Sequence, residues 1–118
     1  MPNRYHFKYF NETTHRTDNS TIYCDGSTVD AVEEFMATHP TARCVYQVFK
    51  QVPVQRDGRG GQFRVDVGKT ARVVTAKDSG EAAEAVEQQL HKPARNVWRL
   101  VSRHVRGRGR DYTLVEAS

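Results

Sequence analysis

The sequence has few of the features that mark membrane, secreted and metal-binding proteins. It contains two cysteines in 118 residues, Cys24 and Cys44, and they form no C-x-x-C pair. No apolar run approaches the roughly 18 residues that a membrane-spanning helix needs. The N-terminal residues lack the apolar stretch of a secretory signal. We therefore expect a cytoplasmic protein with no membrane association, whose cysteines are small buried side chains without a disulfide.

Side chains that catalysis or metal binding requires are present, but not in the necessary spacing. None of the five histidines is paired with another histidine or a cysteine at ligand spacing. Gly68-Lys69-Thr70 resembles the end of a phosphate-binding loop, but Phe63 stands where that loop needs its first glycine, and a β-like run follows. No base is placed beside a serine or cysteine. The sequence predicts no enzyme activity, no catalytic residue, no metal and no cofactor.

The composition is that of a folded domain with a modest core. Hydrophobic residues make up 37% of the chain and charged residues 27%, and apolar residues recur throughout, which excludes a disordered chain. A length of 118 residues suits one core. We predict an α+β fold: a single domain over residues 1–118, with a mostly antiparallel sheet and two helices on one face.

Two amphipathic segments predict these helices, at about 28–39 and 79–91. In the first, Ser27 and Asp30 resemble a capping box, and Pro40 ends the helix. The second opens at Asp78, with Glu81 three residues on. Apolar residues recur at intervals of three or four in both segments, which places them on one face of each helix. The side chains that we expect to be buried there are Val29, Val32, Phe35, Val86 and Leu90.

Strands are predicted from alternation and β-branched content. An N-terminal strand covers residues 4–11, because aromatic and polar residues alternate from Tyr5 to Tyr9. Gly68-Lys69 predicts a tight hairpin. Short strands are also predicted at 21–24, 63–67, 72–75 and 112–116. In 43–54 we expect one side of the strand to carry Cys44, Tyr46, Val48, Val52 and Val54.

The segment 95–106 fits two structures. Its apolar spacing suits a helix between Pro93 and Gly107. Its β-branched residues and its similarity to 43–54 favour a strand. We predict a strand, because the run 112–115 needs a pairing partner, and the helix remains the alternative.

A diverged internal repeat is suggested by two similar segments. Residues 42–48, ARCVYQV, are similar to residues 94–100, ARNVWRL, and the neighbouring elements agree in order. We predict that about 21–67 and 72–116 are two copies of a strand–helix–strand–strand unit, with the strand 4–11 as an addition. Chance similarity between two amphipathic units is the alternative.

Positive charge is concentrated after residue 41. Residues 1–41 carry a net charge of −3 and residues 42–118 a net charge of +7, and 13 of the 18 cations are arginine. Six arginines fall within 95–110 with no acid before Asp111. Arginine suits phosphate and carboxylate groups, and Trp98 and Tyr112 are candidates for stacking on bases, with a core position as the alternative for Trp98. The predicted anion-binding or partner-binding residues are Arg59, Arg64, Arg95, Arg99, Arg103, Arg106, Arg108 and Arg110. The alternative is an ordinary solvated basic face.

The run from Asp25 to Phe35, after a compact hairpin, resembles the small accessory proteins of phages and other mobile elements, including inhibitors of the anti-CRISPR type. That resemblance implies a protein that docks onto a host protein or nucleoprotein complex. Many such inhibitors are acidic mimics of nucleic acid, whereas this chain is basic. Two hypotheses follow: a nucleic-acid-binding module that uses the arginine-rich half, and an interaction protein with a host partner.

Overall fold

A computed structural model describes residues 2–106 and 113–116, with side chains up to Arg103. The elements alternate between strands and helices, and the fold is α+β as predicted. They are β1 (Asn3–Asn11), β2 (Arg16–Cys24), α1 (Thr28–Thr38), β3 (Ala42–Val52), β4 (Gly61–Val67), β5 (Thr70–Ala76), α2 (Ser79–Leu90), β6 (Asn96–Arg106) and β7 (Thr113–Glu116). Both helices are where the sequence predicts them, and 95–106 is a strand. No helix in these ranges is long and apolar enough to cross a membrane.

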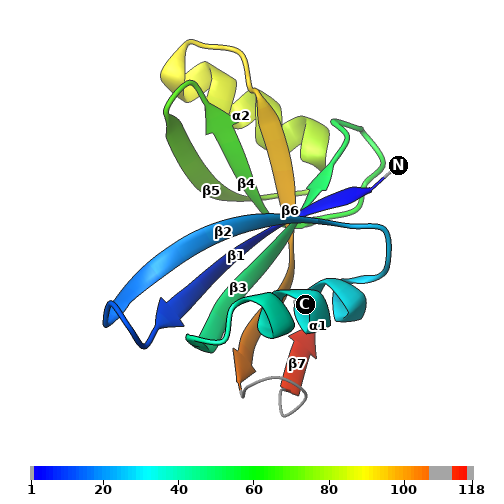
Figure 1. Cartoon of the computed structure of the whole chain (residues 1–118). Helices are drawn as coiled ribbons and strands as arrows, with labels where there is room; N and C mark the ends of the chain where they lie inside the picture. The colour runs from blue at the N-terminus through cyan, green and yellow to red at the C-terminus, as the bar shows by residue number, and fades with distance from the viewer. Residues whose placement is uncertain (1, 107–112, 117–118) are drawn as a thin grey trace. The chain divides into compact units, whose positions relative to one another are not determined.

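The chain divides into two compact units, which Figure 1 shows with one helix each. Unit 1 comprises residues 1–50 and the segment that begins at Val101, and unit 2 comprises Gln51–Leu100. In unit 1, β1 and β2 form an antiparallel hairpin, and after α1 the chain returns as β3 antiparallel to β1. In unit 2, β4 and β5 form the hairpin, and after α2 the chain returns as β6 antiparallel to β4. Each unit is therefore a hairpin, a helix and a returning strand.

This grouping changes the boundaries of the predicted repeat. The predicted order is present, as β2-α1-β3-β4 and β5-α2-β6-β7. However, β4 pairs with β5 and β6, so it belongs to unit 2 and does not close the first half. The recurring group therefore starts one strand earlier than predicted, at β1 and β4. Descent of both units from one duplicated segment stays a prediction.

The core of unit 1 lies between α1 and one face of its strands. Alternate β1 residues, Tyr5, Phe7 and Tyr9, are buried and point to this face. Phe35 is fully buried, with its ring stacked 4.2 Å from that of Phe7. The prediction that Val29 is buried is wrong, since 45% of it is exposed. Val29 lies in the first turn of α1 at the edge of the buried stripe, where the strands do not cover it.

The core of unit 2 is built from smaller helix residues. Phe63, Val65 and Val67 of β4 face α2, together with Val97 of β6. The helix contributes Ala82, Ala83 and Val86 to this core, and the two alanines let its backbone approach the strands closely. Val86 is fully buried as predicted, whereas Leu90 is only partly buried at the end of the helix.

Helix α2 begins at an aspartate that also holds the preceding segment. The buried Asp78 accepts a hydrogen bond from the Glu81 N–H at 2.8 Å and another from the Gly58 N–H at 3.3 Å. The hydrogen bond from the Glu81 N–H is the main reason that the pKa of Asp78 lies below its ordinary value. The carboxylate therefore stabilises the fold when ionised, and this stabilisation is lost as the pH falls through the lowered pKa.

We expect Asp78→Ala to lower the melting temperature by several degrees at pH 7, because the first turn loses its cap. Asp78→Asn keeps an acceptor without the charge, so it should lose less at pH 7. The difference between the wild type and Asp78→Asn should persist above about pH 4 and disappear in stronger acid. Thermal unfolding followed by circular dichroism from pH 2 to 7 measures this, and a difference that does not change with pH would contradict it.

Candidate functional site

The described arginines that the sequence singles out fall into three groups. Arg59 and Arg99 form the first, in unit 2. The guanidinium of Arg99 donates to the backbone carbonyls of Arg59 at 2.8 Å and Gly60 at 3.1 Å. Its Cζ lies 4.7 Å from the centre of the Phe63 ring. Arg99 therefore holds the segment that leads into β4, and two of its N–H groups are used by backbone oxygens.

Arg64 lies on the opposite face of the β4–β6 pair. Its neighbours in β4, Phe63 and Val65, are buried under α2, so Arg64 points away from the helix. Its Nε is 3.0 Å from Oδ1 of Asp66, and Oδ2 of Asp66 accepts from Nε1 of Trp98 at 2.8 Å. Trp98 is buried, as the core alternative for it predicted. Asp66 already balances the charge of Arg64.

Arg95 meets Arg64 at the end of the β4–β5 hairpin. It donates from Nη1 to the carbonyl of Gly68 at 2.8 Å. Both arginines line a polar cavity of about 180 Å³, and its other lining residues are Asp66, Gly68, Lys69, Thr70 and Ala71. Gly68 has a φ of +58°, which the tight hairpin requires, and a strand follows it. Since no helix begins there, the cavity is not a phosphate-binding loop.

Arg103 lies in unit 1, where it lines an open groove of about 360 Å³. We call this the Tyr46 groove, and its lining residues are Lys8, Thr17, Tyr46, Gln47 and Arg103. The side chains of Arg106, Arg108 and Arg110, and Tyr112, lie outside the described residues. Within unit 2 the predicted arginines therefore divide between the two faces of the β4–β6 pair, while Arg103 belongs to unit 1. A surface shared by all of them stays a prediction.

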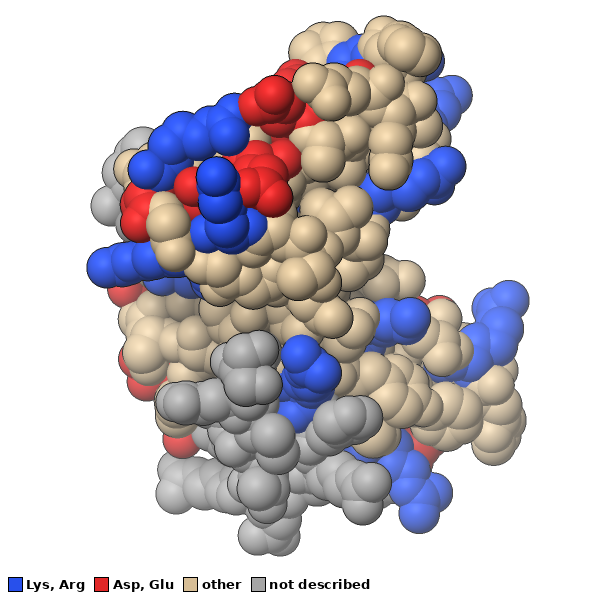
Figure 2. Space-filling view, turned by 180° about the vertical axis from the view of Figure 1, so that it is seen from behind, with Lys and Arg blue, Asp and Glu red and all other residues tan. Residues whose placement is uncertain are grey.

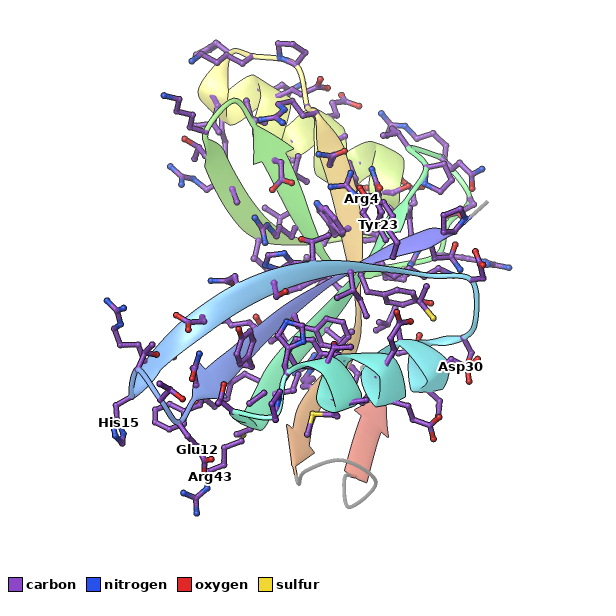
Figure 3. All side chains as sticks on the ribbon, in the orientation of Figure 1. Arg4, Glu12, His15, Tyr23, Asp30 and Arg43 are labelled. Carbon is purple, nitrogen blue, oxygen red and sulfur yellow. The ribbon has the colours of Figure 1, made fainter. Side chains whose placement is uncertain are left out.

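The sequence did not point to the open face of unit 1, which is the face away from α1. Pairing places Arg4 opposite Tyr23, His6 opposite Thr21 and Lys8 opposite Asn19. The guanidinium of Arg4 lies 5.6 Å from the centre of the Tyr23 ring, and Figure 3 shows the two side chains together. The side chains of β1 and β2 on this face include no carboxylate. They are Arg4, His6, Lys8, Phe10, Thr17, Asn19, Thr21 and Tyr23.

The acidic side chains of residues 2–50 lie elsewhere in unit 1. Asp30 caps α1, and Glu33 and Glu34 are exposed on that helix. Glu12 follows the last residue of β1 and pairs with Arg43, the second residue of β3, at 3.3 Å (Figure 3). A negative net charge over residues 1–41 thus coexists with a basic sheet face. The signal that could have found this face is the period-two pattern of 4–11, which puts its cations on one side.

In unit 2 the acidic side chains are mixed with basic ones near the start of α2. Arg56 forms an ion pair with Glu84, and Lys77 lies 3.7 Å from Glu81. Figure 2 shows red and blue side chains side by side in this region, while several other blue side chains are surrounded by tan. The basic residues near α2 are therefore less available to an external anion than those of the groove.

The serines at the helix starts have structural partners. Ser27 completes the capping box with Asp30. The hydroxyl of Ser79 donates to the carbonyl of Pro53 at 2.7 Å and accepts from the Gln55 N–H at 2.9 Å. Within 2–103, no group of three His, Cys, Asp or Glu side chains is placed to hold a metal ion. In the described part of the chain, the arrangement that suits a ligand is the basic face of unit 1.

The sequence matches no protein-family model, and no curated protein or solved structure shows significant similarity to it.

Proposed function

We propose that this protein is a non-enzymatic binding module that contacts nucleic acid through the basic face of unit 1. The observation that carries the proposal is the composition of that face. It combines cations, among them Arg4, Lys8 and Arg103, with the aromatic rings of Tyr23 and Tyr46, and its β1 and β2 side chains include no carboxylate. Positive side chains attract phosphates, and exposed aromatic rings offer stacking surfaces to bases.

The arginines of the C-terminal part would add to this attraction. Arg103 lies in the Tyr46 groove, and the sequence continues with Arg106, Arg108 and Arg110 before the next acid. Since such contacts release counterions from the nucleic acid, their number sets the salt dependence of binding.

We expect a fluorescein-labelled single-stranded oligonucleotide to bind, with log affinity falling linearly against log salt concentration. Four to six phosphate contacts give a slope of roughly −3 to −4 on a single strand, at about 0.7 per contact. Replacing Arg106, Arg108 and Arg110 together with alanine should reduce the magnitude of the slope by up to about 2. Fluorescence anisotropy measures both slopes at salt concentrations between about 50 mM and 200 mM, a range over which the affinity of such contacts changes strongly.

Arg56→Ala is the matched control, because Glu84 already pairs with that arginine. It makes the same change in net charge per residue but should leave the slope unchanged. Undetectable binding of single-stranded and double-stranded DNA and RNA at low salt would contradict the proposal. The remaining hypothesis would then be docking onto a host protein or nucleoprotein complex, which is what the resemblance to accessory proteins of mobile elements implies.

A further inference from the structure

A β-bulge in β3 shapes the Tyr46 groove. In the pairing of β1 with β3, Lys8 lies opposite Gln47 and Tyr9 lies opposite Val45, so Tyr46 is an extra residue in β3. A bulge interrupts the strict alternation of side chains and redirects them. Here two consecutive residues, Tyr46 and Gln47, both line the groove. In a regular strand they would point to opposite faces.

The other lining residues come from three different strands. Lys8 is supplied by β1, Thr17 by β2 and Arg103 by β6, and all of them belong to unit 1. The volume of about 360 Å³ lies at the lower end of the range of roughly 300–1,000 Å³ for ligand sites. A groove of this size suits one small group and not a folded partner.

The charges of the groove are unbalanced. Among the described residues, its lining contains two cations and no carboxylate. The Nε of Arg103 is buried and has no hydrogen-bond partner within the described part of the chain. Neither Lys8 nor Arg103 forms an ion pair with another described side chain. An anionic ligand would supply a counter-charge to Lys8 and Arg103 and a hydrogen-bond acceptor to the Nε of Arg103.

We propose that the Tyr46 groove holds one nucleotide of a single-stranded nucleic acid, with its phosphate at Lys8 and Arg103 and its base stacked on the ring of Tyr46. A single strand is favoured over a duplex because only an unpaired base can expose a face to an aromatic side chain. Gln47 and Thr17 supply a donor and an acceptor for the edge of the base or for the sugar. This inference rests on the proposed function and assigns its site.

The test compares Tyr46→Leu with Tyr46→Phe, using a labelled 12-residue oligo-dT or oligo-U and fluorescence anisotropy. Tyr46→Leu keeps an apolar side chain but removes the π face, so affinity should fall by about 5-fold to 100-fold. Tyr46→Phe keeps the ring and should stay within about 3-fold of the wild type. Lys8→Ala and Arg103→Ala should each reduce the magnitude of the salt slope by about 0.7.

Three controls separate this site from general charge attraction. Tyr23→Leu removes an exposed ring of the same face outside the groove, and it should cost less than Tyr46→Leu. Binding of a duplex of equal charge should not respond to Tyr46→Leu. Thermal unfolding of Tyr46→Leu and of Arg103→Ala verifies that each of these variants folds. If one of them does not fold, the test uses Tyr46→Phe and Lys8→Ala instead.

The outcomes distinguish the groove from the wider proposal. If the oligonucleotide binds with a salt slope but is indifferent to Tyr46→Leu, Lys8→Ala and Arg103→Ala, the groove is overturned and the proposed function stands. If uridine monophosphate displaces the oligonucleotide at micromolar concentration, the ligand is a free nucleotide and the single-strand assignment is overturned. If no nucleic acid binds at low salt, the groove assignment and the proposed function are both wrong.

Discussion

Phe35→Ala should destabilise the protein by about 3–5 kcal/mol. The side chain is fully buried in unit 1, where its ring stacks on Phe7 at 4.2 Å and on His39 at 4.2 Å. Tyr9 meets the same ring edge-on at 5.0 Å. Removing the ring therefore loses three aromatic contacts and leaves a cavity beneath α1. Since small domains have a total stability of about 5–15 kcal/mol, most of it could be lost.

Urea unfolding followed by circular dichroism measures this loss as a lower midpoint at an unchanged slope. Val29→Ala is the matched control, because Val29 is on the same helix with 45% of its surface exposed. That substitution should change stability by about 0.5 kcal/mol or less. Equal effects of the two substitutions would show that Phe35 is not the centre of this core.

Asp66→Ala should destabilise unit 2 by about 1–3 kcal/mol, because it removes the carboxylate that accepts a hydrogen bond from the buried indole N–H of Trp98. One carboxylate oxygen of Asp66 accepts from Nε1 of Trp98 at 2.8 Å, and the other lies 3.0 Å from Nε of Arg64. Trp98 is only 3% exposed, so water does not readily replace the lost acceptor. The same change would also free Arg64 from its acidic partner.

The chain has a single tryptophan, so its fluorescence reports on this position. We expect a shift of Trp98 emission in Asp66→Ala together with a lower urea midpoint. Asp66→Asn retains an amide oxygen that can accept from Trp98, so its midpoint should lie between those of the wild type and Asp66→Ala. An unchanged midpoint in Asp66→Ala would mean that the contact contributes nothing to stability.

The helices could be predicted because their signals are local. Ser27 with Asp30, and Asp78 with Glu81, each make their capping contacts within a single turn. A spacing of three or four residues then identifies the buried side. These contacts depend on no distant part of the chain, so the sequence alone contains them.

The side chains of β3 could not be predicted in the same way. The expectation that Cys44, Tyr46, Val48, Val52 and Val54 share a side is wrong, because the bulge breaks the alternation and Val54 lies beyond the strand with 60% exposed. A bulge arises from the pairing of two strands that are far apart in sequence. Its position is therefore not visible in either strand alone.

The bulge also limits the sequence match between the two units. Two steps along β1, from Phe7 to Tyr9, correspond to three along β3, from Val48 to Val45. Two steps along β4, from Phe63 to Val65, correspond to two along β6, from Arg99 to Val97. A second register shift, at Arg43, interrupts β3 again. The ungapped match of 42–48 to 94–100 is therefore kept in the strand pairing only at Cys44–Val45 and Asn96–Val97.

The candidate site was visible in part. Arg103 was identified from the density of arginines, and it lines the groove. The density did not reveal that Arg99 is engaged by the carbonyls of Arg59 and Gly60, since that contact joins residues about 40 positions apart. The density of charge along the chain does not single out Arg4 and Lys8, because a ligand meets one face of a sheet and not a stretch of sequence.

The division of the chain determines which of the two units is synthesised completely first. Unit 2 is one continuous stretch, Gln51–Leu100, whereas unit 1 resumes only at Val101. In unit 1, β3 has β1 on one edge and β6 as its neighbour on the other. A ribosome adds about 5–20 residues per second, so the 50 residues of unit 2 delay completion of that edge by about 3 to 10 seconds. Throughout this interval the nascent chain presents an open strand edge, at which a chaperone or a second nascent chain can bind.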